Sequence, residues 1–170
     1  MAHKKTNIEE PKFKIVADEK HPFFNAYHKE AYIKSHDCRS TVVLSEQQMQ
    51  YILYNPSKKE IVVYQIDKGL IQGSALKCDF GIYTENDILF LIELKRPERE
   101  YAHALEQIIN TIELLIVTKH ISVKKLNTRI VSRNYPKILT ATERKLENIL
   151  IRDYKCNLQH GSKTLTEVLS

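Results

Sequence analysis

The sequence predicts a single α/β domain in which a central mixed sheet is flanked by helices. Three short segments, 60–67, 77–83 and 88–95, are rich in β-branched and aromatic residues and have the length of strands. A stripe of Ile and Leu side chains with helical spacing then runs through residues 101–116. A further short strand is expected at 128–132. The predicted order is therefore helix, three strands, helix, strand, with the core at about 45–132 of a domain spanning 1–170.

Two helices are expected before the first strand. Residues 21–33 place apolar side chains near helical spacing. Ser45 and Gln48 have the spacing of a capping box, which marks the start of a helix. The apolar face of that helix would contain Met49, Ile52 and Leu53, and residues 55–57 would end it. This segment is the predicted first helix of the core.

The ends of the chain are less regular. Residues 1–20 mix Lys and Glu without periodicity and are expected to form an arm or an edge element. Thr140 and Glu143 have the spacing of a second capping box, which predicts a helix beginning there. The tail at 155–170 is expected to add an edge strand.

The composition excludes several classes of protein. The three cysteines are widely spaced, which favours neither a disulfide framework nor a structural zinc site. The four glycines supply no nucleotide-binding loop of the dinucleotide or Walker kind. No apolar run reaches the roughly 18 residues of a membrane span, and the N-terminus lacks the apolar region of a signal peptide. We expect a cytoplasmic protein that does not associate with membranes.

Positive charge is concentrated in one part of the chain. The formal net charge is +5, but the segment from Lys119 to Lys145 contains eight basic residues and one acid. Such a segment can face nucleic-acid phosphates or can simply be a solvated surface. The candidates for phosphate contact are Lys124, Lys125, Arg129, Arg133 and Lys137.

Strand alternation predicts a pair of facing carboxylates. A three-residue loop at 85–87 would place Asp79 directly opposite Glu93, with Cβ atoms about 4.5–5.5 Å apart. Two carboxylates this close repel unless a cation lies between them, and oxygen ligands suit Mg²⁺. Lys95 shares their face of the sheet and could stabilise the charge on a phosphate under attack. Charged residues at the end of an ordinary hairpin are the alternative interpretation.

These residues resemble the motif of the PD-(D/E)xK nuclease superfamily. The match consists of Lys77-Cys-Asp-Phe-Gly-Ile-Tyr, then Ile88-Leu-Phe-Leu-Ile-Glu-Leu-Lys, followed by a helix. Cys78 stands where the motif has proline, and we expect it to be a core residue on the Phe80 face. The resemblance implies a restriction-endonuclease-like core.

The resemblance also implies roles for individual residues. Asp79, Glu93 and the backbone carbonyl of Leu94 would bind Mg²⁺ or Mn²⁺, and Lys95 would be the catalytic lysine. Many members of this superfamily add an acid from the first core helix, and Glu46 is the candidate, with Glu30 and Glu60 in reserve. An acid in a first helical turn also simply complements the helix dipole.

Gln107 resembles a glutamine that some branches of the superfamily place near the site. An ordinary solvated glutamine is the competing interpretation. His103, on the same predicted helix, is interpreted as a surface residue and not as a ligand.

The expected function is Mg²⁺-dependent hydrolysis of nucleic acid, most simply as a DNA endonuclease. The partner would be nucleic acid, and a homodimer would be needed to cut two strands together. The alternatives are a binding module that retains the nuclease fold without cleaving, and an unrelated α/β protein with a charged hairpin.

Overall fold

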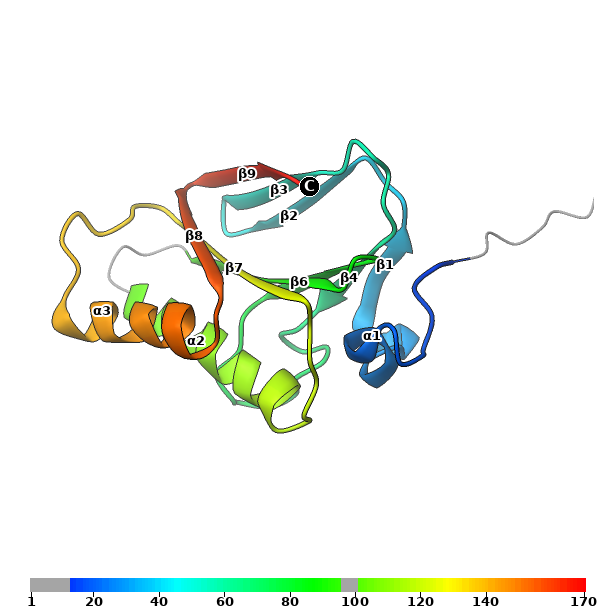
Figure 1. Ribbon diagram of the computed structural model, residues 1–170. Coiled ribbons are helices and arrows are strands. Elements are labelled where there is room, and N and C mark those ends of the chain that lie inside the picture. The colour runs from blue at the N-terminus through cyan, green and yellow to red at the C-terminus, as the bar shows by residue number, and fades with distance from the viewer. Residues whose placement is uncertain (1–12, 96–100) are drawn as a thin grey trace, which may run out of the picture.

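The computed structural model describes residues 13–95 and 101–170. It is a mixed α/β protein (Figure 1). The helical elements are α1 (Pro22–Ala26), η1 (Glu30–Tyr32), α2 (Tyr101–Ile112), η3 (Glu113–Val117), α3 (Ala141–Asn148) and η4 (Ile149–Asp153). The strands are β1 (Ile33–Asp37), β2 (Thr41–Glu46), β3 (Met49–Tyr54), β4 (Ile61–Gln65), β5 (Phe80–Thr84), β6 (Ile88–Lys95), β7 (Lys125–Ser132), β8 (Asn157–Ser162) and β9 (Thr164–Val168).

The central part of the sheet follows the predicted order. Strands β4, β5 and β6 form an antiparallel meander, and α2 carries the chain over to β7, which is parallel to β6. The stripe predicted for the helix at 101–116 is confirmed, because Leu105, Ile108 and Ile112 pack against Leu89 and Leu91 of β6. This meander and crossover place the carboxyl end of β6 beside the carboxyl end of β7.

The predicted helix after Ser45 is wrong. Residues 41–54 form the hairpin of β2 and β3, closed by a two-residue turn between Glu46 and Met49. Met49, Tyr51 and Leu53 are buried at alternate positions, which is the period of a strand. The short helix expected within 21–33 is present as the five-residue α1, which is followed by the turn η1, and β1 begins at Ile33 and pairs with β4.

The hairpin changes how the sheet is covered. The sheet order is β1-β4-β5-β6-β7-β8-β9-β3-β2, and it folds over so that β9, β3 and β2 lie above β4 and β6, with the helices below (Figure 1). Phe80, Ile82 and Phe90 therefore pack against the hairpin and not against helices. The expected burial of this apolar face is confirmed, but the prediction of helices on both faces is wrong.

The remaining predictions concern the two ends of the chain. Thr140 and Glu143 form both hydrogen bonds of the predicted capping box at the start of α3. The tail forms the predicted strand as β8, which is followed by β9, but the prediction that it lies at an edge of the sheet is wrong, because the edge strands are β1 and β2. Among the residues that the structure describes, no helix is long and apolar enough to cross a membrane.

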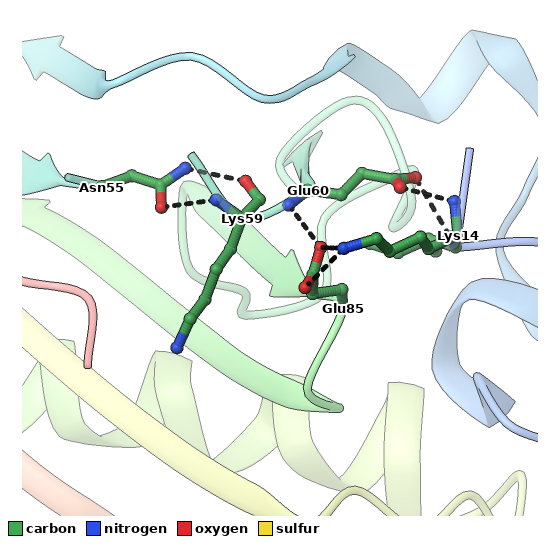
Figure 2. Close-up of polar contacts among 6 residues, drawn as sticks. Lys14, Asn55, Lys59, Glu60 and Glu85 are labelled. Atoms are coloured by element: carbon green, nitrogen blue, oxygen red, sulfur yellow. Dashed lines mark hydrogen bonds and ion pairs between the residues drawn. The ribbon is translucent and has the colours of Figure 1, made fainter. Parts of the chain in front are cut away.

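The segment at 13–15 is bound to the sheet near the start of β4. Figure 2 shows Lys14 beside Glu60 and Glu85. The backbone N–H groups of Lys14 and Ile15 donate to the Glu60 carboxylate at 2.6 and 3.0 Å, and the backbone N–H of Glu60 donates to Glu85 at 2.8 Å. In the same view the buried Asn55 bridges to Lys59 through two hydrogen bonds. This end of the sheet is held by a dense set of polar contacts.

Candidate functional site

Asp79 and Glu93 meet at the opposite end of the meander. The observed pairs include Phe80 with Ile92 and Ile82 with Phe90, so Asp79, one residue before β5, lies opposite Glu93. This register is the one that the loop at 85–87 predicts. The backbone of β6 holds Asp79 in place, because its N–H donates to the Ile92 carbonyl at 3.1 Å and its Oδ2 accepts from the Leu94 N–H at 2.8 Å.

Glu93 is buried with only part of its carboxylate satisfied. The side chain is 1% exposed, and its Oε1 lies 3.2 Å from the Lys95 ammonium nitrogen. Its other oxygen, Oε2, is buried and accepts no hydrogen bond from the described part of the chain. Leaving a buried acceptor without a partner costs about 1–3 kcal/mol, and more for a charged group. This oxygen is thus suited to a ligand that the described chain does not supply.

The two carboxyl groups resist ionisation. Burial raises the pKa of Asp79 to about 7, and the Leu94 N–H opposes this rise. Burial, followed by the charge of Asp79, raises the pKa of Glu93 well above its usual range, while Lys95 acts to lower it. Like-charge repulsion in a buried space has this effect. A cation placed between the two groups would allow both to ionise.

Two further acids influence this pair. Glu46 lies at the end of β2 and not on a helix, and its negative charge contributes to the raised pKa of both Asp79 and Glu93. Asp67 also raises the pKa of Asp79, and its carboxylate lies 3.3 Å from the Lys77 ammonium. Sequence reasoning missed Asp67, although it ends the first strand-like segment much as Glu93 nears the end of the third.

The reserve acids lie elsewhere. Glu60 is at the start of β4, in the network that Figure 2 shows, at the end of the sheet remote from Asp79. Glu30 is exposed in η1.

Helix α2 fixes the segment that leads into Asp79. The Gln107 amide donates to the Lys77 carbonyl at 2.7 Å, and the Cys78 N–H donates to the Thr111 hydroxyl at 2.9 Å. The Gln107 Oε1 is buried without a partner in the described chain. Gln107 is therefore a positioning residue in this structure. Cys78 is buried as expected, although it packs on the α2 side of the sheet and not with Phe80.

The predicted basic surface is divided between the two ends of β7. Lys124 and Lys125 lie at its amino end, where Lys125 pairs with Ile88, whereas Lys95 pairs with Ser132 at its carboxyl end. A strand of this length separates the two ends by roughly 23 Å. Arg133 directly follows Ser132 and is exposed at the site end, and Lys137 is exposed further along the chain.

Arg129 does not form part of a surface for phosphates. Its side chain is 3% exposed and donates to both carboxylate oxygens of Glu167, at 2.6 and 2.9 Å. It also donates to the backbone carbonyls of Thr128 and Asn157. The prediction that Arg129 contacts a phosphate therefore fails, because its donors are already used to join β7 to β8 and β9.

The protein ligands for a cation would be few. Across residues 13–95 and 101–170, no three His, Cys, Asp or Glu side chains are grouped closely enough to hold a metal ion. A cation at Asp79 and Glu93 would need backbone, water or substrate oxygens as well. Mg²⁺ is commonly bound in this way, by one or two carboxylates together with water and substrate phosphates. The donor set therefore fits Mg²⁺ or Mn²⁺.

Comparison with known proteins gives no match to this chain among family models, curated proteins or solved structures.

Proposed function

We propose that this chain is a metal-dependent nuclease that hydrolyses phosphodiester bonds in nucleic acid, with DNA as the favoured substrate. The observation that carries the proposal is the buried Glu93 carboxylate, whose Oε2 has no partner in the described chain and whose neighbour is the raised-pKa carboxyl of Asp79. The ion pair with Lys95 uses only Oε1. A site for a divalent cation accounts for the unsatisfied one.

Each residue has a distinct part in this chemistry. Asp79, Glu93 and the Leu94 carbonyl would hold Mg²⁺ or Mn²⁺, which when bound activates water and polarises a phosphate. Lys95, 3.2 Å from Glu93, can donate to a phosphate oxygen as negative charge develops on it. Gln107 keeps the Asp79 segment in position through the Lys77 carbonyl. Burial of both carboxylates limits competing contact with bulk water.

The order of the elements supports a restriction-endonuclease-like core. The meander β4-β5-β6, the crossover helix α2 and the parallel strand β7 correspond to the order implied by the motif resemblance. The part that differs is the start, where a hairpin replaces the expected helix. A metal-binding acid from a first helix is therefore not part of the proposal, and Glu46 is retained as an acid on a strand.

Metal titration and cleavage assays test the proposal. Calorimetry with Mg²⁺ and Mn²⁺ should show binding to the wild type and an affinity about 10–100-fold lower or lost for Asp79→Asn and Glu93→Gln. Cleavage of plasmid and oligonucleotide DNA should fall at least about 100-fold in both variants and in Lys95→Ala. Lys95→Ala should keep most of its metal affinity, because an ammonium group is not a metal ligand. Glu106→Gln, which changes an exposed acid on α2, is the matched control.

The non-cleaving binding module is the competing outcome. If the wild type binds neither metal and cleaves no nucleic acid, the proposal is wrong and that module becomes the better interpretation. Sedimentation with and without DNA would show whether two copies assemble, as cutting both strands of a duplex would require.

A further inference from the structure

A hollow lies at the end of the sheet where β6 ends at Lys95. This cavity, here called the turn pocket, has a volume of about 300 Å³ and is lined by Gln48, Met49, Arg133 and Lys163. Three separate segments contribute: the β2-β3 turn, the end of β7 and the β8-β9 turn. Met49 is 3% exposed, whereas the two cationic residues are exposed. The pocket thus combines a buried apolar residue with an accessible positive rim.

The backbone around the turn pocket is held firmly. The Lys163 N–H donates to the Ser132 carbonyl at 2.8 Å, and the Lys163 carbonyl accepts from the Gln50 N–H at 2.9 Å. The Ser162 hydroxyl donates to the Arg133 carbonyl at 2.8 Å. These bonds fix where both cationic side chains begin, so less conformational entropy is lost when they bind a ligand.

Three residues beside the turn pocket adopt the left-handed conformation. Gln47, Gln48 and Lys163 have φ values of 48°, 70° and 61°. This region is uncommon for residues other than glycine, asparagine and aspartate, and such strain concentrates at functional positions. The two adjacent glutamines form the tight turn that brings Gln48 to the pocket.

The charges in the turn pocket are not neutralised within the described chain. Neither the Arg133 guanidinium nor the Lys163 ammonium has an ion-pair partner among residues 13–95 and 101–170. Arg and Lys that line one small space suit a phosphate group.

The turn pocket lies at the same end of the sheet as the proposed site but on the other face: Met49 belongs to the cluster of Phe80 and Leu94, whereas alternation places Glu93 on the face of Leu91. Lys95, Ser132 and Ser162 are in register across β6, β7 and β8. Adjacent strands are about 4.8 Å apart, so Arg133 and Lys163 begin roughly 5 and 10 Å from Lys95 across the sheet. A nucleic-acid strand that crosses this end of the sheet would therefore pass from the Lys95 face to the turn pocket.

We propose that the turn pocket binds a backbone phosphate of the substrate strand, next to the phosphate held at Asp79 and Glu93. The inference rests on the proposed nuclease function and adds the path of the strand. The strand would cross the carboxyl ends of β6, β7 and β8, from Lys95 towards the β2-β3 turn. Lys124 and Lys125, at the other end of β7, would not contact it.

Salt dependence of binding tests this path. The double variant Arg133→Gln/Lys163→Gln should bind oligonucleotides more weakly than wild type in EDTA, where no cleavage occurs. Each lost phosphate contact should lower the slope of log affinity against log salt by about 0.7–0.9. Between 50 and 200 mM salt, the affinity advantage of wild type should therefore shrink about threefold for each contact. Glutamine is used because the chain already places it in the left-handed region at this edge.

The matched control is Lys124→Gln/Lys125→Gln, which removes the same charge at the far end of β7. It should leave the slope within error of wild type, and both variants should keep the wild-type melting temperature. If the two variants have equal salt slopes, or if neither slope differs from that of wild type, the turn pocket is not a phosphate site. Metal binding by the Arg133→Gln/Lys163→Gln variant separates the two proposals. If this variant still binds metal and its salt slope equals that of wild type, only the proposed phosphate site in the turn pocket is wrong. If wild type binds no metal but the slope changes as expected, only the nuclease proposal fails.

Discussion

The two ends of the central sheet each contain a buried glutamate, and the two glutamates differ in their hydrogen bonds. Glu60 is 3% exposed and both of its oxygens accept hydrogen bonds, from the backbone N–H groups of Lys14 and Ile15, while His36 Nε2 lies 2.6 Å from Oε1. Glu93 is 1% exposed, yet one of its oxygens has no partner in the described chain. Burial alone therefore does not distinguish the two carboxylates. The number of satisfied oxygens does, and the proposed cation site rests on this difference.

The largest expected effect separates these two glutamates directly. Glu60→Gln replaces one acceptor by a donor that faces N–H groups, so it should lower the free energy of unfolding by about 3 kcal/mol. Glu93→Gln should leave metal-free stability unchanged or raise it slightly, because it removes a carboxyl group whose ionisation is opposed by burial and by Asp79. Urea unfolding of both variants in EDTA measures the contrast. Equal losses would mean that Glu93 is also a structural group.

An effect of similar size is expected when pH is varied without metal. The pKa of Asp79 rises from 3.8 to about 7 on folding, so the folded protein binds this proton more tightly than the unfolded chain. The stabilisation that Asp79 contributes is therefore complete below pH 4 and is lost as the pH rises to about 7. The free energy of unfolding should fall by on the order of 2–4 kcal/mol over this range. Thermal unfolding in EDTA from pH 4 to pH 8 checks this, with Asp79→Asn expected to flatten the profile.

Asp37 provides a control, because its contribution to stability changes with pH in the opposite direction. Its hydrogen bond to Arg39 lowers the pKa of Asp37, so its contribution is present at neutral pH and is lost as the pH falls. Asp37→Asn should thus leave the decline between pH 4 and pH 7 in place. Adding Mg²⁺ should reverse that decline, because both carboxyl groups can then ionise. A pH profile that Mg²⁺ does not alter would contradict a cation site.

The smallest effect is expected at Lys14. Its ammonium lies 3.2 Å from Glu85, but the side chain is 71% exposed, and such ion pairs contribute about 0–1 kcal/mol. Lys14→Met removes this pair and keeps the backbone N–H that donates to Glu60. Urea unfolding should show a loss below about 1 kcal/mol. A larger loss would show that the ammonium, and not the backbone, holds the segment at 13–15.

The sequence predicted the meander, α2 and the register of Asp79 with Glu93 because these depend on local patterns. The capping-box spacing was informative at Thr140 and misleading at Ser45. At 45–53 the apolar residues fit a helix through Met49, Ile52 and Leu53, but they also fit a strand through Met49, Tyr51 and Leu53. The two-residue turn at Gln47 and Gln48 contains no glycine or asparagine to indicate a hairpin.

Features that depend on distant partners could not be predicted. Arg129 looks like a surface cation in its own segment, and its burial is decided by Glu167, 38 residues later in the chain. Lys163 lies outside the basic segment and reaches the site edge only through the turn between β8 and β9. The position of the tail determines where Glu167 and Lys163 lie. This position cannot be recognised from the composition of either segment.

The tail also sets the order in which the two parts of the site can assemble. Asp79 and Glu93 are brought together by one hairpin, whose short loop forms quickly. The turn pocket is complete only when β9 pairs with β3, which joins Gln50 to Thr164 across more than a hundred residues. Closing so long a loop is entropically costly and slow. A nascent chain that still lacks its last strands would thus have the carboxylate pair without the turn pocket, and the proposed phosphate site would be the last part to form.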